Sequence, residues 1–519
     1  MNRRDFLNGV CAAALAPALV LTAARAETPP PLPDPQAMID AARHLAQSPY
    51  APRPQILNAP FAALSYDSYR GIRPRPGYAG DLALGPHFVA DLLPPGWLFR
   101  DPVSIDLPDH DTAFSAQLFD YDPRYFTPPP QAGVLPDMGF SGLRLRHQLN
   151  RAGIWDEVLV LQGASYFRAL ARGTVYGLSA RALALGTGGP TPEEFPVTRH
   201  ITVFDSGTSV QFGCLVDSPR CAAALIATLT PGDTTTMDCT LHLFARTRIE
   251  DAGIAPLTSM FQHNDLGPAT IDDFRPAVHD SDVLVMDNGA GERLWRPLAN
   301  PAQVQVSAFE DTTPRGFGVM QMPVEFTHFR DQEGAYHRRP SVWVTPRGNW
   351  GAGAVMLLEI PTPNEFADNI VAFWRPRTAL EPGEHRFAYR LDWCPPGPSA
   401  LPAQDHPLLP LRSASGIEPN AGEGRLFVLD FKPAPGTGNT ADYTQAQLDF
   451  GTDPAATYIT GAAFYPLREE SGAWRASFVF TPPADMTVAE LRLRLRLPSG
   501  ALLAPVWLHR WTRSHGGGV

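Results

Sequence analysis

Carboxylates and tryptophans cluster between residues 263 and 374 of this 519-residue chain, where they punctuate short apolar runs. The residues are Asp265, Asp272, Asp273, Asp280, Asp282, Glu359, Glu365, Asp368, Trp295, Trp343, Trp350 and Trp374. A carbohydrate cleft needs both types, because the apolar face of a sugar stacks on an aromatic ring while carboxylates orient hydroxyls and move protons at the glycosidic oxygen. Composition by itself favours the alternative, in which the tryptophans are core residues and the aspartates cap turns.

Other catalytic chemistry leaves no signature in the sequence. There is no G-x-S-x-G, H-E-x-x-H, P-loop or G-x-G-x-x-G motif, and the 14 His residues are scattered. No Cys or His spacing indicates zinc, so we expect no metal and no cofactor. The net charge of −11 excludes the basic surface of a nucleic-acid binder.

The elements that position the carboxylates are predicted to be short strands. The chain holds 55 Pro and 43 Gly, with 44% hydrophobic and 18% charged residues, which favours an all-β globular protein over long helices or disorder. One helix is predicted over residues 34–47, with Asp34 as its N-cap. Strand-like runs lie at 157–162, 210–215, 236–245, 304–309, 341–344, 354–360, 424–431, 462–465, 473–480 and 490–497.

This pattern divides the chain into four parts. We expect a large β-sandwich over residues 27–394, a Pro-rich linker over 395–411 and an immunoglobulin-like sandwich over 412–519. Residues 1–26 resemble a twin-arginine export signal, with Arg3-Arg4, an apolar run and cleavage after Ala26. An ordinary secretory signal and a retained anchor are the alternatives. We therefore expect the protein in the periplasm, with no membrane span after cleavage.

Four cysteines remain after the expected cleavage: Cys214, Cys221, Cys239 and Cys394. Cys214 and Cys221 flank a turn signal, so a disulfide across a hairpin is one interpretation in an oxidising compartment. Buried free thiols are the favoured one.

Several sequence blocks resemble the MdoG/MdoD (OpgG/OpgD) family of periplasmic glucan biosynthesis proteins. They are residues 163–169, 175–181, 193–196, 255–261, 274–276, 279–281, 294–298, 339–341, 359–362 and 368–374. The resemblance implies a galactose-mutarotase-like β-sandwich followed by an immunoglobulin-like domain. It also implies action on the linear β-1,2-linked backbone of osmoregulated periplasmic glucans, by inverting hydrolysis or by transglycosylation that closes a ring.

The resemblance assigns Asp368 as general acid and Asp280 as general base, the latter through a proton relay. We expect apolar neighbours and Glu365 to keep Asp368 protonated. Further candidate substrate contacts are Tyr166, Arg168, Trp295, Trp343, Trp350, Glu359 and Glu365. For the first five of these, core packing is an equal alternative.

The chain departs from the family pattern in three places. Met322 and Val324 replace the two arginines of a Q-R-x-R-D-F block, Ile201-Thr202 stand where most members have Phe-Trp, and Val283 replaces a Gly. If those arginines and aromatic residues hold substrate or relay water, the cleft is remodelled, which favours transglycosylation, a different glucan or weak hydrolysis. The alternative function is a non-catalytic glucan-binding scaffold that works beside the membrane glucosyltransferase of the pathway. The partners we consider are a β-1,2-glucan, that transferase and a second copy of the chain, with no nucleic acid.

Overall fold

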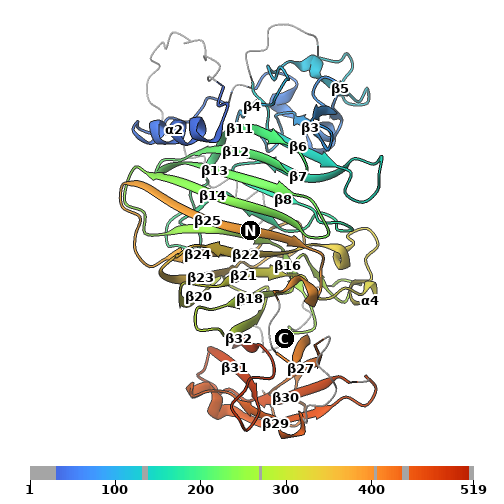
Figure 1. The fold of residues 1–519 in the computed structure, drawn as a ribbon. Coiled ribbons are helices and arrows are strands. Elements are labelled where there is room, and N and C mark those ends of the chain that lie inside the picture. Colours follow the sequence, from blue (N-terminus) through green and yellow to red (C-terminus); the bar gives the residue numbers. More distant parts are fainter. Residues whose placement is uncertain are drawn as a thin grey trace.

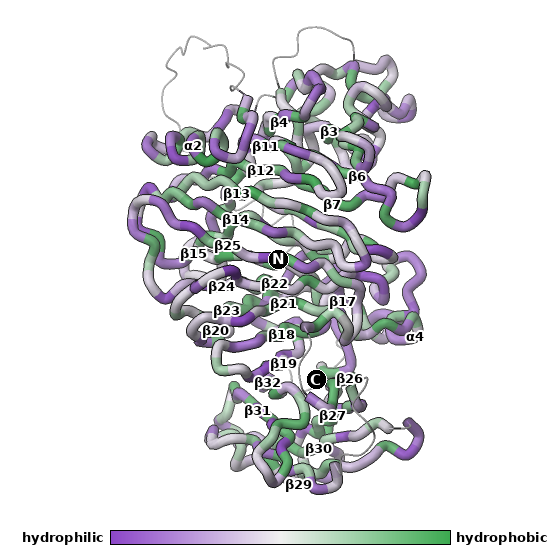
Figure 2. The backbone as a smooth tube through the Cα atoms, viewed as in Figure 1, coloured by the Kyte–Doolittle hydropathy of each residue, from purple (hydrophilic) through white to green (hydrophobic). Residues whose placement is uncertain are grey.

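The computed structural model describes residues 31–513, apart from 56, 131–137, 268–271, 403–405, 423, 435–442 and 471. The predicted export signal lies outside the described residues. The predicted helix is confirmed as α2 (Pro35–Ala46), where the Asp34 carboxylate accepts from the Ala37 amide and Pro35 opens the first turn. Its buried residues Met38, Ile39 and Ala42 pack on Leu215, Ala224 and Phe244 of the strands beneath it, and the helix mixes hydrophobic with polar positions (Figure 2).

Two large antiparallel-rich sheets dominate the molecule, which confirms the predicted all-β class (Figure 1). The 11-stranded sheet contains, in spatial order, β2 (Leu82–Leu84), β3 (Phe88–Leu93), β6 (Gly142–His147), β7 (Asp156–Gln162), β8 (Tyr166–Ala169), β9 (Ser179–Arg181), β15 (Ala252–Ser259), β24 (Ile370–Pro376), β23 (Ala352–Glu359) and β20 (Gln305–Thr312), with β10 (Ala184–Leu185) beside β15.

The second sheet has 13 strands. Its spatial order is β28 (Gln447–Asp449), β31 (Val488–Arg496), β32 (Val506–Thr512), β19 (Arg293–Pro297), β18 (Val283–Asp287), β21 (Gly316–Met320), β22 (Ser341–Arg347), β25 (Gly383–Cys394), β14 (Thr235–Ala245), β13 (Cys221–Thr230), β12 (Val210–Asp217), β11 (Val197–Ser206) and β4 (Ser104–Asp106).

Smaller elements complete the fold. The strand pairs are β1 (Ile72–Pro74) with β5 (Phe119–Tyr121), and β16 (Phe261–His263) with β17 (Val278–His279). Short helices are α3 (Tyr66–Arg70), α4 (Phe326–Phe329), η1 (Phe61–Ala63), η2 (Ala116–Leu118), η3 (Tyr336–Arg338), η4 (Pro398–Ala400), η5 (Tyr443–Gln445) and η6 (Pro454–Tyr458).

The main core lies between the two large sheets. On β14, alternate residues such as Met237, Leu241 and Leu243 point inward, as the period of two in a strand requires. They share one hydrophobic cluster with Leu357 and Trp374 of the opposite sheet. This packing fixes the loops that connect the strands at the edges of the sandwich.

The C-terminal strands form a second sandwich that continues the first. Strands β26 (Leu408–Ile417), β27 (Arg425–Pro433), β30 (Trp474–Phe480) and β29 (Ile459–Pro466) make a four-stranded sheet at one end of the molecule (Figure 1). It packs on β28, β31 and β32, the strands that extend the 13-stranded sheet through a parallel pairing of β32 with β19. Because β26 begins at Leu408, it takes in the end of the stretch predicted as a linker.

The four described cysteines are buried free thiols, as the favoured interpretation predicted. In the β12–β13 hairpin Cys214 is opposite Leu225, and Cys221 pairs with Ala245 of β14. The register therefore keeps Cys214 and Cys221 from facing each other, and the disulfide interpretation is wrong for this structure. Burial raises the pKa of both thiols to about 12.

Candidate functional site

Asp280 occupies the turn between β17 and β18, where the backbone fixes its position. Its amide donates to the carbonyl of Met260, at 2.8 Å, and the residue is only 6% exposed. The preceding residue, His279, is fully buried: its Nδ1–H donates to the side-chain oxygen of Gln321, and Nε2 of Gln321 donates to the His279 carbonyl. The loop that carries Asp280 is therefore held on both sides.

Asp368 precedes β24 and is held by its neighbour Asn369. The buried Asn369 amide donates to the carbonyls of Phe261 and Ile360, both at 2.9 Å, and its oxygen accepts from the Phe261 amide at 2.8 Å. Asp280 and Asn369 are thus attached to the adjacent residues Met260 and Phe261. One short chain segment positions both candidate catalytic loops.

Each of the two aspartates faces an arginine. Nη1 of Arg339 lies 3.2 Å from Oδ1 of Asp280, and Nη2 of Arg168 lies 3.8 Å from Oδ2 of Asp368. Arg339 is itself oriented, since its guanidinium donates to the carbonyls of Tyr176 and Gly334 and lies over the Tyr336 ring at 4.8 Å. Arg168 comes from β8 and Arg339 from the residue after η3, so separate elements converge here.

The electrostatics of this group centre on Asp280. Burial raises the pKa of Asp280 to about 6, Arg339 opposes the shift, and the negative charges of Asp368 and Glu365 add to it. The carboxyl group is then ionised at neutral pH, and its pKa lies close enough to neutral pH for it to accept a proton during the reaction. Burial likewise raises the pKa of Tyr166 to about 12, with Asp368 and Arg168 among the charges that act on it.

Glu365 joins the site through a cluster of carboxylates around Arg275. Arg275 Nη2 lies 2.5 Å from Glu365, Nη1 lies 2.8 Å from Asp331, and the guanidinium also pairs with Asp273. This ion pair connects the loop before β17 to the loop before β24. The site thus presents the carboxyl groups of Asp280 and Asp368, each beside an arginine and each exposed to a different extent. Such a pair suits acid–base catalysis on a hydroxylated substrate.

Known proteins resemble this chain over nearly its whole length. The family described as "Periplasmic glucan biosynthesis protein, MdoG" matches residues 34–511. A relative from Vibrio cholerae serotype O1 named "Glucans biosynthesis protein G" is 42% identical over 497 residues, which cover 92% of this chain and 87% of the relative. Proteins of the same name from Shewanella sp. strain MR-7 and Shewanella putrefaciens are each 41% identical.

The chain belongs to the MdoG family.

This result confirms the resemblance identified in the sequence: the family is one of periplasmic glucan biosynthesis proteins. No helix in the described part of the chain has the length and apolar character needed to cross a bilayer. The described residues also contain no cluster of His, Cys, Asp or Glu suited to a metal ion.

The structure of this MdoG family member corrects four of the predicted substrate contacts. Trp295 and Trp343 are buried in the core that joins the two sandwiches, and Trp350 packs against Trp374 in the main core. Glu359 is fully buried and paired with Arg296 at 3.0 Å. Trp295, Trp343 and Glu359 lie on strands that turn them inward, and Trp350 lies in the loop between β22 and β23. Core packing, the alternative considered for the tryptophans, is what the fold has.

The remaining predicted residues do come together in this MdoG family member. Tyr166, Arg168, Glu365, Asp280 and Asp368 act on one another electrostatically or are in ion-pair contact. The apolar surroundings expected for Asp368 are not found. Phe366 is exposed to solvent, Glu365 is bound by Arg275, and Asp368 itself pairs with Arg168.

Three residues of the site were missed by the sequence reasoning: Arg339, Tyr336 and Arg275. Two of them carried a usable signal, since Arg339 opens the R-P-S block and Arg275 is central to the F-R-P block of the family. Tyr336 follows a residue with left-handed backbone, Ala335 at φ 45°, and the single turn of η3 places its ring under Arg339, three residues later.

The residues that depart from the family pattern, Val283 included, are buried except for Val324. Gln321, which is retained, binds His279 next to Asp280. Met322 is buried in the C-terminal core, Val324 is exposed, and Ile201 and Thr202 are buried on β11.

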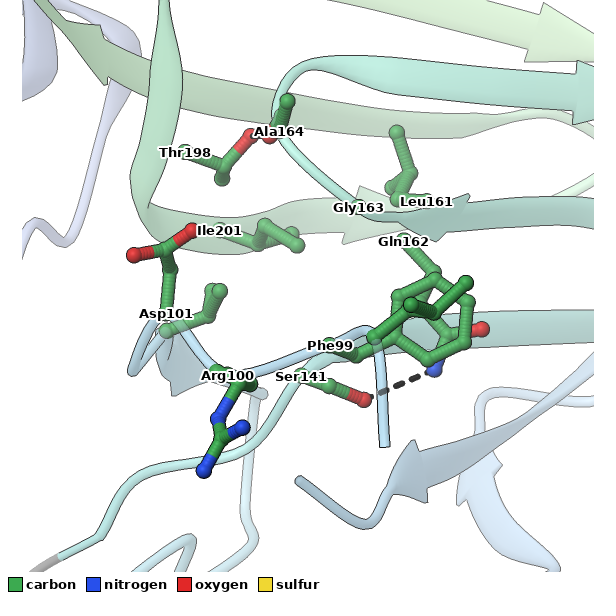
Figure 3. Close-up of a pocket in the computed structure, with 12 residues that line it drawn as sticks. Phe99, Arg100, Asp101, Ser141, Leu161, Gln162, Gly163, Ala164, Thr198 and Ile201 are labelled. Atoms are coloured by element: carbon green, nitrogen blue, oxygen red, sulfur yellow. Dashed lines mark hydrogen bonds between the residues drawn. The ribbon is translucent and has the colours of Figure 1, made fainter. Parts of the chain in front are cut away.

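Two cavities in this MdoG family member lie away from the aspartates. The pocket in Figure 3 encloses about 30 Å³ between Phe99, Gln162 and Thr198, and the Gln162 amide donates to the Ser141 hydroxyl within it. A neighbouring cavity of about 190 Å³ is lined by Arg53 and other residues of the same end of the molecule. The first is too small for a sugar ring, and neither is lined by Asp280 or Asp368.

Proposed function

We propose that this protein is a glycoside hydrolase or transglycosylase that acts with inversion on the linear β-1,2-glucan backbone of osmoregulated periplasmic glucans. The observation that supports it most is the pairing of Asp280 with Arg339 and of Asp368 with Arg168, on two loops fastened to one chain segment. An inverting glycosidase requires a pair of carboxyl groups, one to protonate the leaving oxygen and one to take the proton of the attacking acceptor.

In the proposed reaction Asp368 protonates the glycosidic oxygen while the bond from that oxygen to the anomeric carbon breaks. An acceptor hydroxyl attacks the anomeric carbon from the opposite face, and its proton passes through a relay to the Asp280 carboxylate. Water as acceptor gives hydrolysis, whereas a hydroxyl of the same glucan gives a ring. Arg339 moderates the pKa of Asp280 so that the base is ionised at neutral pH.

The test is product analysis with purified protein and linear β-1,2-glucan. Hydrolysis yields a ladder of short linear oligomers, and cyclisation yields a product that is lighter by one water than the linear chain with the same number of glucosyl residues. Asp368→Asn and Asp280→Asn should each reduce turnover by at least about 100-fold. Asp449→Asn is the matched control, because Asp449 is a partly exposed carboxylate that pairs with Arg496 far from the site. Equal inertness of wild type and Asp368→Asn contradicts the proposal.

A non-catalytic scaffold that binds glucan beside the membrane glucosyltransferase is the second candidate. It is favoured by the loss of the family's arginine pair at Met322 and Val324 and by relatives named for biosynthesis. Glucan affinity that is unaffected by Asp368→Asn, with no turnover, is the result it predicts.

We propose further that the protein reaches the periplasm by the twin-arginine route with cleavage after Ala26. The support is Arg3-Arg4 followed by Phe6-Leu7, an apolar run and an A-x-A site.

A further inference from the structure

The most exposed large apolar side chains in the described part of the chain lie beside the candidate site. Phe274 is 81% exposed and Phe366 is 70% exposed. Phe274 immediately precedes Arg275, and Phe366 immediately follows Glu365, two residues before Asp368. Single exposed apolar residues need no explanation, but two phenyl rings next to one ion pair at a proposed active site do.

The described residues next to the two rings are held by ion pairs and a hydrogen bond. The 2.5 Å contact between Arg275 and Glu365 joins the residues adjacent to both rings. Arg275 is also held by Asp273 and by the buried Asp331. The backbone amide of Phe366 donates to Asn364, at 3.0 Å. Both rings therefore project to solvent from anchored backbone, so their exposure is a property of the fold.

We infer that Phe274 and Phe366 form a stacking platform for glucosyl residues of the substrate chain, an inference that rests on the proposed function. A glucosyl ring has hydroxyls at its edge and an apolar C–H face, and that face stacks on aromatic rings. The charged groups of the site can bind the hydroxyls of the glucosyl ring, whereas the tryptophans expected to stack on its C–H face are buried. The two phenylalanines supply the missing surface.

A glucan fits this surface better than a second copy of the chain. The core of a protein interface is depleted of charged residues, whereas Phe274 lies 5.8 Å from the Arg275 guanidinium amid the carboxylates that bind it. Alternating ionic groups and exposed rings are the mixture that a polyhydroxylated chain with apolar faces recognises.

The experiment measures binding without turnover. In the Asp368→Asn background, calorimetry with linear β-1,2-gluco-oligosaccharides should give a Kd about five- to twenty-fold higher for Phe274→Ala and for Phe366→Ala. Phe366→Trp should retain the parent affinity. Tyr78→Ala is the matched control, because Tyr78 is also exposed (50%) and stacks on an arginine, Arg75 at 4.2 Å, but belongs to the N-terminal part of the chain. It should leave the Kd unchanged.

The outcomes separate this inference from the proposed function. Unchanged affinity in both alanine variants overturns the platform even if wild type hydrolyses glucan. Weakened binding in both, with an inert wild type, supports the platform and contradicts the chemistry. No binding by the parent contradicts both. Sedimentation that shows a dimer lost in Phe274→Ala overturns the inference in favour of self-association.

Discussion

Nη1 of Arg339 lies 3.2 Å from Oδ1 of Asp280, and this contact lowers the pKa of the proposed base. Burial pushes the pKa of Asp280 up, and Arg339 is the largest influence that pushes it down. The guanidinium is held over Tyr336 by the carbonyls of Tyr176 and Gly334, so it cannot follow a moving carboxylate far. The contact therefore makes the ionisation of Asp280 sensitive to a single substitution.

Replacing Arg339 should move the acid limb of the pH–activity profile upward. With Arg339→Met, Asp280 loses its nearest cation and its pKa rises above about 6, by about one unit or more. Turnover of linear β-1,2-glucan, measured from pH 4.5 to 8.5, should then fall at a higher pH than in wild type. Arg339→Lys should give an intermediate limb. An unshifted limb in the Met variant would show that Asp280 is not the titrating base.

Stability should depend on pH through Asp280 in a direction opposite to that of most aspartates. Its folded pKa is about 6 and its ordinary value is 3.8, so the folded state binds more protons than the unfolded state between these values. The free energy of unfolding therefore falls as pH rises through this window. Asp280→Asn should remove the fall and stabilise the protein by as much as ~3 kcal/mol at pH 7.5.

The measurement is urea unfolding of both proteins at intervals from pH 4 to pH 7.5. Asp449→Asn serves again as the control, because Asp449 is partly exposed and pairs with Arg496. A difference between wild type and Asp280→Asn that does not grow with pH would contradict the prediction.

Asn369 should matter for both stability and chemistry. Asn369→Ala deletes hydrogen bonds to Phe261 and Ile360 in a buried place and leaves their backbone groups unpaired. We expect a loss of roughly 2–4 kcal/mol in unfolding free energy and a fall in kcat larger than the change in KM, because the loop of Asp368 is released. Chemical denaturation and steady-state kinetics measure the two effects. Asn420→Ala, at an exposed turn, should change neither.

Export should fail when the paired arginines are replaced. Arg3→Lys together with Arg4→Lys keeps the charge of the segment but removes the feature that the twin-arginine route requires. We expect precursor in the cytoplasm, and in wild type a mature N-terminus at Glu27 in the periplasmic fraction. Fractionation with N-terminal sequencing measures both. Normal export of the double variant would indicate an ordinary secretory signal.

Local pattern sufficed for much of this protein. Strand periodicity predicted β14 and β31, where Leu491, Leu493 and Leu495 are buried between the half-exposed arginines. The Asp34-Pro35 pair predicted the start of α2. Both candidate aspartates were identified from the family blocks, because such a block is recognised by its residue types without knowledge of where the fold places it.

Tertiary structure decided which side chains face a substrate. Whether a tryptophan on a strand stacks on a sugar or fills a core depends on what covers that face of the sheet, and sequence spacing does not contain that information. Trp295 and Trp343 are covered because β32 joins β19 and brings the C-terminal sandwich against them. Likewise the pairing of Arg275 with Glu365, 90 residues apart in the chain, exposes Phe274 and Phe366 together. The sequence alone determined which chemical groups the protein contains, and long-range packing determined which of them lie next to one another and which face solvent.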